Sequence, residues 1–231
     1  MKVAIIPARG GSKRIPRKNI KTFCGKPIIV WSIEAAIQSA CFDRVIVSTD
    51  DQEISDIAKQ YGAEAPFVRP DSLSDDFTGT TEVVAHALGC IQDRIDVTDL
   101  ACCIYATAPF IQVDDLKGSL KQIETEYVDY CFAVTDYAFP IQRSIRITRD
   151  RRCEMFQPNK FNQRSQDLEA AYHDAGQFYW GRVSAWLEDR PIFSAQAIPY
   201  VVPRYRAQDI DTPEDWQFAE YMFQSMMNKV N

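Results

Sequence analysis

The sequence predicts an α/β fold, with a mostly parallel sheet and helices on both faces. Two observations carry this prediction. Short apolar runs alternate with longer amphipathic stretches up to about residue 135, and strands that alternate with helices of this length form βαβ units. The length of 231 residues, 46% of them apolar and 25% charged, also suits one globular domain of generous size.

The elements follow in chain order. Strands are expected at 3–7, 44–48, 100–105, 129–135, 177–180 and 198–202, because each of these runs is short and apolar. Helices are expected at 27–40, 50–61, 80–91, 113–125, 183–188 and from 212 onward. Thr212 and Pro213 are typical of an N-cap and a first helical turn, and Gly62 is typical of a C-cap.

Residues 139–174 do not follow this alternation. They contain Pro140, Pro158 and many polar residues, with only short strand-like pieces. We expect a protruding arm or small subdomain there. No linker is long enough to separate two domains, so residues 1–231 are expected to form one.

The charge is unevenly distributed. The chain carries 26 basic and 32 acidic residues, a formal net charge of −6. The first acidic residue is Glu34, and eight basic residues precede it: Lys2, Arg9, Lys13, Arg14, Arg17, Lys18, Lys21 and Lys26. A single cationic segment on an acidic body favours an anionic small molecule, and a nucleic-acid partner is not expected.

Several protein classes are disfavoured. No apolar run approaches the roughly 18 residues of a membrane span, and the N-terminus lacks the pattern of a signal peptide. The seven cysteines form no C-x-x-C pair, and the two histidines lie far apart, which argues against zinc. We therefore expect a cytoplasmic protein with reduced thiols and no membrane partner.

The segment 8–19 follows directly after the first predicted strand, and in an open α/β sheet ligands bind beyond the carboxyl ends of strands. Its glycines would leave backbone N–H groups free to approach an anion, and its cations would neutralise that anion. The segment matches neither G-x-G-x-x-G nor G-x-x-x-x-G-K-[ST]. The prediction of phosphate binding therefore depends on its charge and position.

Spaced motifs in a consistent order extend this interpretation. They are IPARGGSK with IPRKN within 6–19, VSTDD at 47–51, RP with DDFT within 69–78, YATAPF at 105–110, RSQDL at 164–168, DAGQFYW at 174–180 and DID at 209–211. Together they resemble the CMP-sialic acid synthetase family, cytidylyltransferases that join CTP to a 2-keto sugar acid. The resemblance spans nearly the whole chain.

The resemblance implies a Rossmann-like nucleotidyltransferase sheet and a homodimer formed through a small dimerisation arm at 139–174. The substrates would be CTP and a nonulosonic acid, with Mg²⁺, or Mn²⁺ in its place, as cofactor. The implied nucleotide-binding residues are Ala8, Arg9, Gly10, Gly11, Ser12, Lys13, Lys18, Asn19, Arg69 and Thr80, the sugar-binding residues Tyr105, Thr107, Arg164, Gln166 and Tyr179, and the metal ligands Asp209 and Asp211. Catalysis is assigned to Arg9, Lys13, Lys18, Asp209 and Asp211.

The metal assignment also has independent support. Residues two apart on an extended chain point the same way, so Asp209 and Asp211 can converge on one cation. Mg²⁺ favours one or two carboxylates together with phosphate oxygens and water. The alternative, that Asp211 only assists the start of the last helix, leaves Asp209 unexplained.

The acceptor is predicted from departures from the family pattern. Tyr105 and Ile111 stand where many sialic acid synthetases have Gln and Arg, and we expect both, with Phe110, to edge the sugar pocket. This favours a more deoxygenated sugar, and pseudaminic acid is the expected acceptor. Legionaminic, N-acetylneuraminic and 3-deoxy-octulosonic acids stay open as alternatives. From a different class, a non-catalytic module that binds CTP also stays open.

Overall fold

A computed structural model describes residues 1–228. The strands are β1 Lys2–Pro7, β2 Thr22–Phe23, β3 Lys26–Pro27, β4 Arg44–Ser48, β5 Leu100–Ile104, β6 Tyr130–Asp136, β7 Ile145–Ile147, β8 Cys153–Met155, β9 Tyr172–Arg182 and β10 Ala197–Val201. The helices are α1 Ile28–Ser39, α2 Gln52–Gln60, α3 Thr80–Gly89, α4 Val113–Thr125, α5 Val183–Leu187 and α6 Pro213–Met227. Every predicted strand and helix is present, with boundaries shifted by a few residues at most except in β9.

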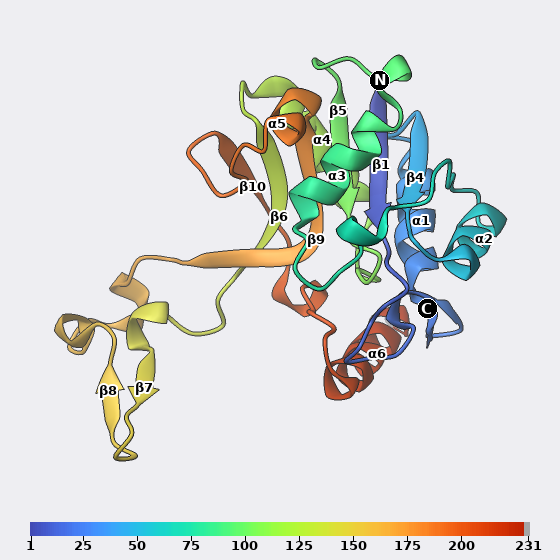
Figure 1. Cartoon of the computed structure of the whole chain (residues 1–231). Helices are drawn as coiled ribbons and strands as arrows, with labels where there is room; N and C mark the ends of the chain where they lie inside the picture. The colour runs from blue at the N-terminus through green and yellow to red at the C-terminus, as the bar shows by residue number, and fades with distance from the viewer. Residues whose placement is uncertain (229–231) are drawn as a thin grey trace.

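Six strands form the central sheet in the order β10-β6-β9-β5-β1-β4 (Figure 1). β10 pairs with β6, and β5 and β4 with β1, in parallel. Only β9 runs antiparallel, between β5 and β6. The prediction of a mostly parallel α/β sheet is confirmed. β9 is longer than expected because its first residues are exposed and polar, and an apolar run predicts only the buried half.

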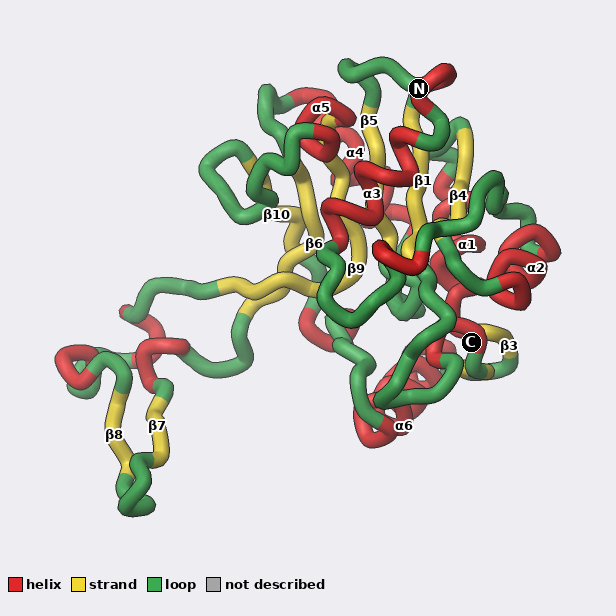
Figure 2. Tube along the Cα trace, in the orientation of Figure 1, coloured by secondary structure: helices red, strands yellow, loops and turns green. Residues whose placement is uncertain are grey.

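Helices cover both faces of the sheet (Figure 2). Ala4 and Ile6 of β1 are buried on the face covered by α1, α2 and α4. Their neighbours Val3 and Ile5 are buried on the opposite face, against α3 and α5. This alternation follows from the two-residue period of a strand and explains why both sets of side chains are apolar.

A third cluster fixes α6 to the segment that follows β1. Trp216 and Phe223 of α6 pack edge-on against Phe23, with ring centroids 5.5 Å apart in each pair. The cluster also contains Phe110, which packs against Phe223. Residues 209–211, which directly precede α6, are thereby held beside the basic loop.

The same packing corrects one prediction. Phe110 and Ile111 do not edge the cavity described below: Phe110 is buried in the α6 cluster, and Ile111 is buried in the core beside α1 and α4. Both side chains are apolar and lie at the start of the turn into α4, so the core accommodates them. Of the three residues expected at the sugar pocket from this segment, only Tyr105 lies there.

The segment between β6 and β9, residues 137–171, projects away from the sheet and is called the arm here (Figure 1). It carries the antiparallel pair β7–β8. Large apolar side chains on it are exposed, among them Phe139 at 80% and Ile147 at 76%. The arm occupies nearly the expected range 139–174.

The signals predicted for the ends of α2 and α6 are confirmed at Gly62, Thr212 and Pro213. Asp51 caps α2 by accepting a hydrogen bond from the Ile54 amide, and Gly62 follows the helix with φ of 89°. Thr212 caps α6, with Pro213 in the first turn. All seven cysteines are free thiols, three of them fully buried. Within residues 1–228, no helix combines the length and apolar character that crossing a membrane requires.

Candidate active site

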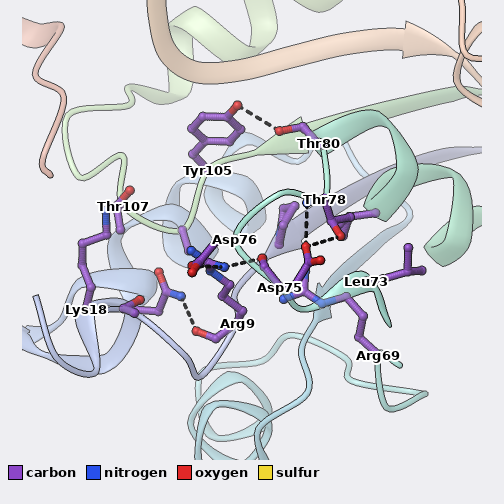
Figure 3. A pocket seen from close by; sticks show the side chains of 16 residues that line it. Arg9, Lys18, Arg69, Leu73, Asp75, Asp76, Thr78, Thr80, Tyr105 and Thr107 are labelled. Atoms are coloured by element: carbon purple, nitrogen blue, oxygen red, sulfur yellow. Dashed lines mark hydrogen bonds and ion pairs between the residues drawn. The ribbon is translucent and has the colours of Figure 1, made fainter. Parts of the chain in front are cut away.

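A cavity of about 330 Å³ lies where the carboxyl ends of β1 and β5 meet the start of α3 (Figure 3). Parallel neighbouring strands end on the same edge of the sheet, so the segments after Pro7 and Ile104 both reach it. Eight predicted site residues line the cavity: Arg9, Ser12, Lys18, Asn19, Arg69, Thr80, Tyr105 and Thr107. Residues more than 90 positions apart in the sequence are thus brought to one site.

One glycine of the basic loop, Gly10, acts differently from the prediction. The N–H of Gly10 donates to Asp50 Oδ1 at 2.9 Å, so it is not free for an anion. A Cβ at Gly10 would lie 2.7 Å from Asp51 Oδ2, so the residue is needed for close approach to α2. Ala8 is buried and its N–H donates to the Ser48 carbonyl at 2.9 Å. These contacts shape the loop, while open space surrounds Gly11.

Two cations of the loop converge on one carboxylate. Arg9 Nη1 lies 2.8 Å from Asp76 Oδ1, and Lys13 Nζ pairs with the other oxygen of Asp76. Arg9 and Asp76 line the cavity, whereas the Lys13 side chain is 80% exposed at its rim. The two positive charges of Arg9 and Lys13 are therefore partly neutralised by the carboxylate of Asp76.

A second group of polar side chains closes the base of the cavity. Asn19 donates from Nδ2 to the Arg9 carbonyl at 2.9 Å, which leaves its Oδ1 as an acceptor. Arg69 is only 3% exposed, and burial lowers the pKa of its guanidinium. It donates to Ser74 Oγ at 3.1 Å, and its Nη2 lies 3.8 Å from Asp50. A buried guanidinium with so distant a counter-charge can hold a ligand oxygen.

The predicted metal ligands lie at the edge of the same loop. Lys18 Nζ donates to the Ile210 carbonyl at 2.8 Å and lies 3.2 Å from Asp211 Oδ1. Arg14 lies 2.9 Å from the other oxygen of Asp211. Loss of solvation and the negative charge of Asp211 raise the pKa of Asp209. Two carboxylates that repel each other beside a basic loop suit a divalent cation.

This pair would need ligands from elsewhere to complete a metal site. Among residues 1–228, no three His, Cys, Asp or Glu side chains come together in a way that could hold a metal ion. Mg²⁺ commonly takes one or two carboxylates, and phosphate oxygens and water supply its other ligands. The donor set of Asp209 and Asp211 therefore fits Mg²⁺ bound together with a nucleotide.

Tyr105 forms one wall of the cavity. Its hydroxyl lies 3.0 Å from Thr80 Oγ1, and its ring lies 5.3 Å from the ring of Tyr179. Tyr179 is only 2% exposed and does not line the cavity; its hydroxyl donates to Asp174. Burial, with Tyr105 and Asp174 nearby, raises the pKa of Tyr179 well above its usual range. In this chain Tyr179 therefore supports the wall from behind.

Arg164 and Gln166 belong to the arm, which projects away from the sheet (Figure 1), and neither residue lines the cavity of its own chain. Arg164 Nε donates to Asp167 at 2.7 Å across one short turn. Both residues are exposed. The chain by itself does not bring these two predicted sugar-binding residues to the site.

Sequence reasoning missed part of the cavity wall. The cavity is also lined by residues of the segment between Arg69 and α3 and by one residue of α3 itself: Leu73, Asp75, Asp76, Thr78, Gly79 and Val83. One signal was available: the acidic pair 75–76 lies just before α3, and a strongly basic loop needs counter-charge when no ligand is bound. The pairing partner itself was not predictable, because it depends on how the two segments meet in space.

Comparisons with known proteins identify the family. The sequence model of the family described as "Cytidylyltransferase" matches residues 3–215. A "Pseudaminic acid cytidylyltransferase" of Campylobacter jejuni serotype O:2 is 46% identical over 221 residues, 96% of this chain and 95% of that protein. A "CMP-N,N'-diacetyllegionaminic acid synthase" of Legionella pneumophila is 30% identical, over 96% of each chain.

A solved structure supports the fold. The structure titled CMP:2-keto-3-deoxy-manno-octonic acid synthetase complexed with CTP aligns with a TM-score of 0.72 at 17% identity. The alignment covers 97% of this chain and 99% of that one. The family match, the extent of the similarity and the shared fold lead to one conclusion: this chain belongs to the cytidylyltransferase family.

Proposed function

We propose that the protein transfers CMP from CTP to the anomeric 2-hydroxyl of pseudaminic acid, giving CMP-pseudaminic acid and pyrophosphate. The observation that carries the proposal is the joining of the basic loop and the Tyr105 wall around one cavity. The loop supplies groups for a nucleotide, and the wall supplies an aromatic surface for a sugar. The 46% identical relative named for pseudaminic acid supports this acceptor over other nonulosonic acids.

The cavity offers complementary groups to each part of CTP. Asn19 Oδ1 can accept from the exocyclic amino group of cytosine, which is a donor. The buried guanidinium of Arg69 can donate to the base or ribose oxygens. Arg9, Lys13 and Lys18 supply positive charge for the phosphates. A triphosphate would then lie along the loop that follows β1.

The chemistry requires positioning and neutralisation of charge. The 2-hydroxyl of the sugar attacks the α-phosphorus, and the bond from that phosphorus to the leaving pyrophosphate breaks. Arg9 and Lys18 stabilise negative charge that grows on the phosphate oxygens, and the rigid loop keeps donor and acceptor aligned. No covalent enzyme intermediate is required.

Mg²⁺ is proposed as the cofactor, with Asp209 and Asp211 as its protein ligands. Mn²⁺ is a possible substitute, because it also favours oxygen ligands. When bound, such a cation neutralises phosphate charge in the transition state. Lys18 and Arg14 hold Asp211 in place, which keeps the segment 209–211 against the loop. Because CTP is a cytoplasmic nucleotide, we expect the protein to act in the cytoplasm.

A homodimer formed through the arm is also proposed. Exposed apolar side chains on a thin projection, including Phe139, Ile147 and Phe156, mark a surface made for a partner. A second copy that covers this surface would bring its own Arg164 and Gln166 toward the cavity. That arrangement would explain why these residues lie far from the site of their own chain.

Pyrophosphate release with CTP and a panel of nonulosonic acids tests the proposal. We expect turnover with pseudaminic acid, much less with legionaminic and N-acetylneuraminic acids, and none with CTP alone. Asp209→Asn protein is the control, because any pyrophosphate that it releases does not come from turnover at the proposed active site. Absence of pyrophosphate with every acid, from protein that binds CTP, would instead support a non-catalytic CTP-binding module.

A further inference from the structure

Asp76 neutralises two cations that the proposed function assigns to the phosphates of CTP. One oxygen of its carboxylate pairs with Arg9 (Figure 3), and the other pairs with Lys13. Arg9 also donates to the backbone carbonyl of Asp75. Both cations are therefore engaged by the segment 75–76.

The local backbone explains why Asp76, and not Asp75, plays this part. The carboxylate of Asp75 turns back on its own chain, accepting from the amides of Phe77 and Thr78 at 2.9 and 2.7 Å. It also accepts from the Thr78 hydroxyl at 2.7 Å. This turn fixes the loop and leaves the next carboxylate directed at the basic segment.

The segment is also anchored on its other side. Arg69 Nε donates to Ser74 Oγ at 3.1 Å, and Ser74 Oγ donates to the Pro70 carbonyl at 3.0 Å. Because Arg69 is buried in the cavity floor, the loop that carries Asp76 is tied to the site itself. The Asp76 carboxylate thus stands where it meets any anion that approaches Arg9 and Lys13.

We propose that Asp76 is a specificity-determining residue, an internal competitor that sets which anions can occupy the phosphate site. The proposal rests on the proposed function, since it takes Arg9 and Lys13 as phosphate contacts. An entering anion must release Asp76 from both cations. A triphosphate or pyrophosphate replaces both contacts with several oxygens, whereas one phosphate replaces them less completely.

The lowered pKa of Asp76, caused first by the hydrogen bond from Lys13 and then by Arg9, keeps this competitor ionised at neutral pH. The pairs are solvent-exposed in part, so each is weak enough for a polyanion to break. After transfer, the same carboxylate can pair again with Arg9 and Lys13 as pyrophosphate leaves. The Asp76 carboxylate, which competes with CTP for the two cations, therefore also assists the release of pyrophosphate.

Calorimetric binding to Asp76→Asn protein tests the proposal, with CTP, pyrophosphate and cytidine as ligands. We expect CTP and pyrophosphate to bind roughly three- to tenfold more tightly than to the wild-type protein, because the competing charge is gone. Cytidine, which carries no phosphate, should bind equally to both. Asp71→Asn is the matched control, since it removes one exposed carboxylate from the same segment and should leave all three affinities unchanged.

A second variant shows whether the tighter binding of CTP and pyrophosphate depends on the proposed cations. Lys13→Gln in the Asp76→Asn background should remove most of the tightening. Unchanged or weaker binding of pyrophosphate to folded Asp76→Asn protein would overturn the proposal, and weaker binding only with Mg²⁺ present would indicate a metal ligand instead. Pyrophosphate binding does not depend on the acceptor sugar or on turnover, so a failed activity assay and a failed Asp76 experiment remain distinguishable.

Discussion

Lys18 Nζ lies 3.2 Å from Asp211 Oδ1, although 193 positions separate the two residues in the chain. Lys18 also holds the adjacent Ile210 carbonyl at 2.8 Å. The contact joins the basic loop after β1 to the segment that precedes α6. A nucleotide bound on the loop would therefore lie close to Asp211, which fits the proposed metal-assisted phosphoryl transfer.

The first prediction concerns these carboxylates. Asp209→Asn and Asp211→Asn should each lower kcat by on the order of 10²-fold or more, because charge stabilisation by a metal amounts to several kcal/mol. Steady-state pyrophosphate release at varied Mg²⁺ measures the effect. Glu214→Gln, an exposed acid at the start of α6, is the matched control and should retain normal turnover. Near-normal turnover of folded Asp209→Asn protein would contradict the metal assignment and would support the alternative, in which the carboxylates only stabilise the start of α6.

The second prediction concerns the nucleotide. CTP should exceed ATP and GTP by at least about tenfold in kcat/KM, equivalent to about 1.4 kcal/mol. The cavity presents Asn19 Oδ1 as an acceptor beside Arg69, which suits the amino group and carbonyl of cytosine. Asn19→Ala should reduce the preference for CTP. Competition assays with equal concentrations of the nucleotides measure it, and equal rates with GTP would refute the cytidylyl assignment.

The buried framework and half of the site could be predicted from sequence. Continuous apolar runs such as residues 100–104 are predictable because both faces of a central strand are buried. The first residues of β9 are exposed, so no continuous apolar run marks them in the sequence. Periodicity also gives no strand direction, and the antiparallel course of β9 became visible only in the structure.

The remaining errors at the site have a common cause. A motif places a residue in a segment, but it does not give the direction of its side chain. Phe110 and Tyr105 lie five positions apart in one motif, yet Phe110 packs against α6 while Tyr105 lines the cavity. The pair of Lys13 with Asp76 spans 63 positions, and the contact of the Gly10 amide with Asp50 spans 40. Such contacts are set by the whole fold.

The third prediction concerns the acceptor. The kcat/KM for pseudaminic acid should exceed that for N-acetylneuraminic acid by roughly 10²-fold or more, since the hydroxylated tail of the latter loses polar partners against Tyr105. Tyr105→Gln should narrow the gap, mainly by weakening turnover of pseudaminic acid. Tyr105→Phe is the control, because it keeps the ring and removes only the hydroxyl that lies 3.0 Å from Thr80 Oγ1. Equal use of both acids by the wild-type enzyme would contradict the argument.

The fourth prediction concerns pH. The hydrogen bond from Arg17 lowers the pKa of Asp51, so the pair stabilises the folded state above the unfolded pKa of about 3.9. Asp51→Asn keeps a good N-cap and should cost about 1 kcal/mol in the free energy of unfolding, a modest figure because Arg17 is 40% exposed. Urea unfolding should show this difference from pH 8 to 5, and it should shrink as pH falls below about 4. If the difference in unfolding free energy does not change with pH, the loss of stability comes from a weaker N-cap of α2 and not from the lost ion pair with Arg17.

The last prediction concerns the arm. If the arm of one copy completes the cavity of another, an Arg9→Gln chain and an Arg164→Ala chain should each be nearly inactive alone but active when co-expressed. Random pairing makes half of the dimers mixed, each with one intact site, so about a quarter of wild-type activity is expected. Arg149→Ala, which removes an exposed cation elsewhere on the arm, should retain activity alone. Purification through two different tags isolates the mixed dimers for the assay. No recovery in mixed dimers would show that Arg164 acts within its own chain, because a site completed in cis has no intact copy in such a pair.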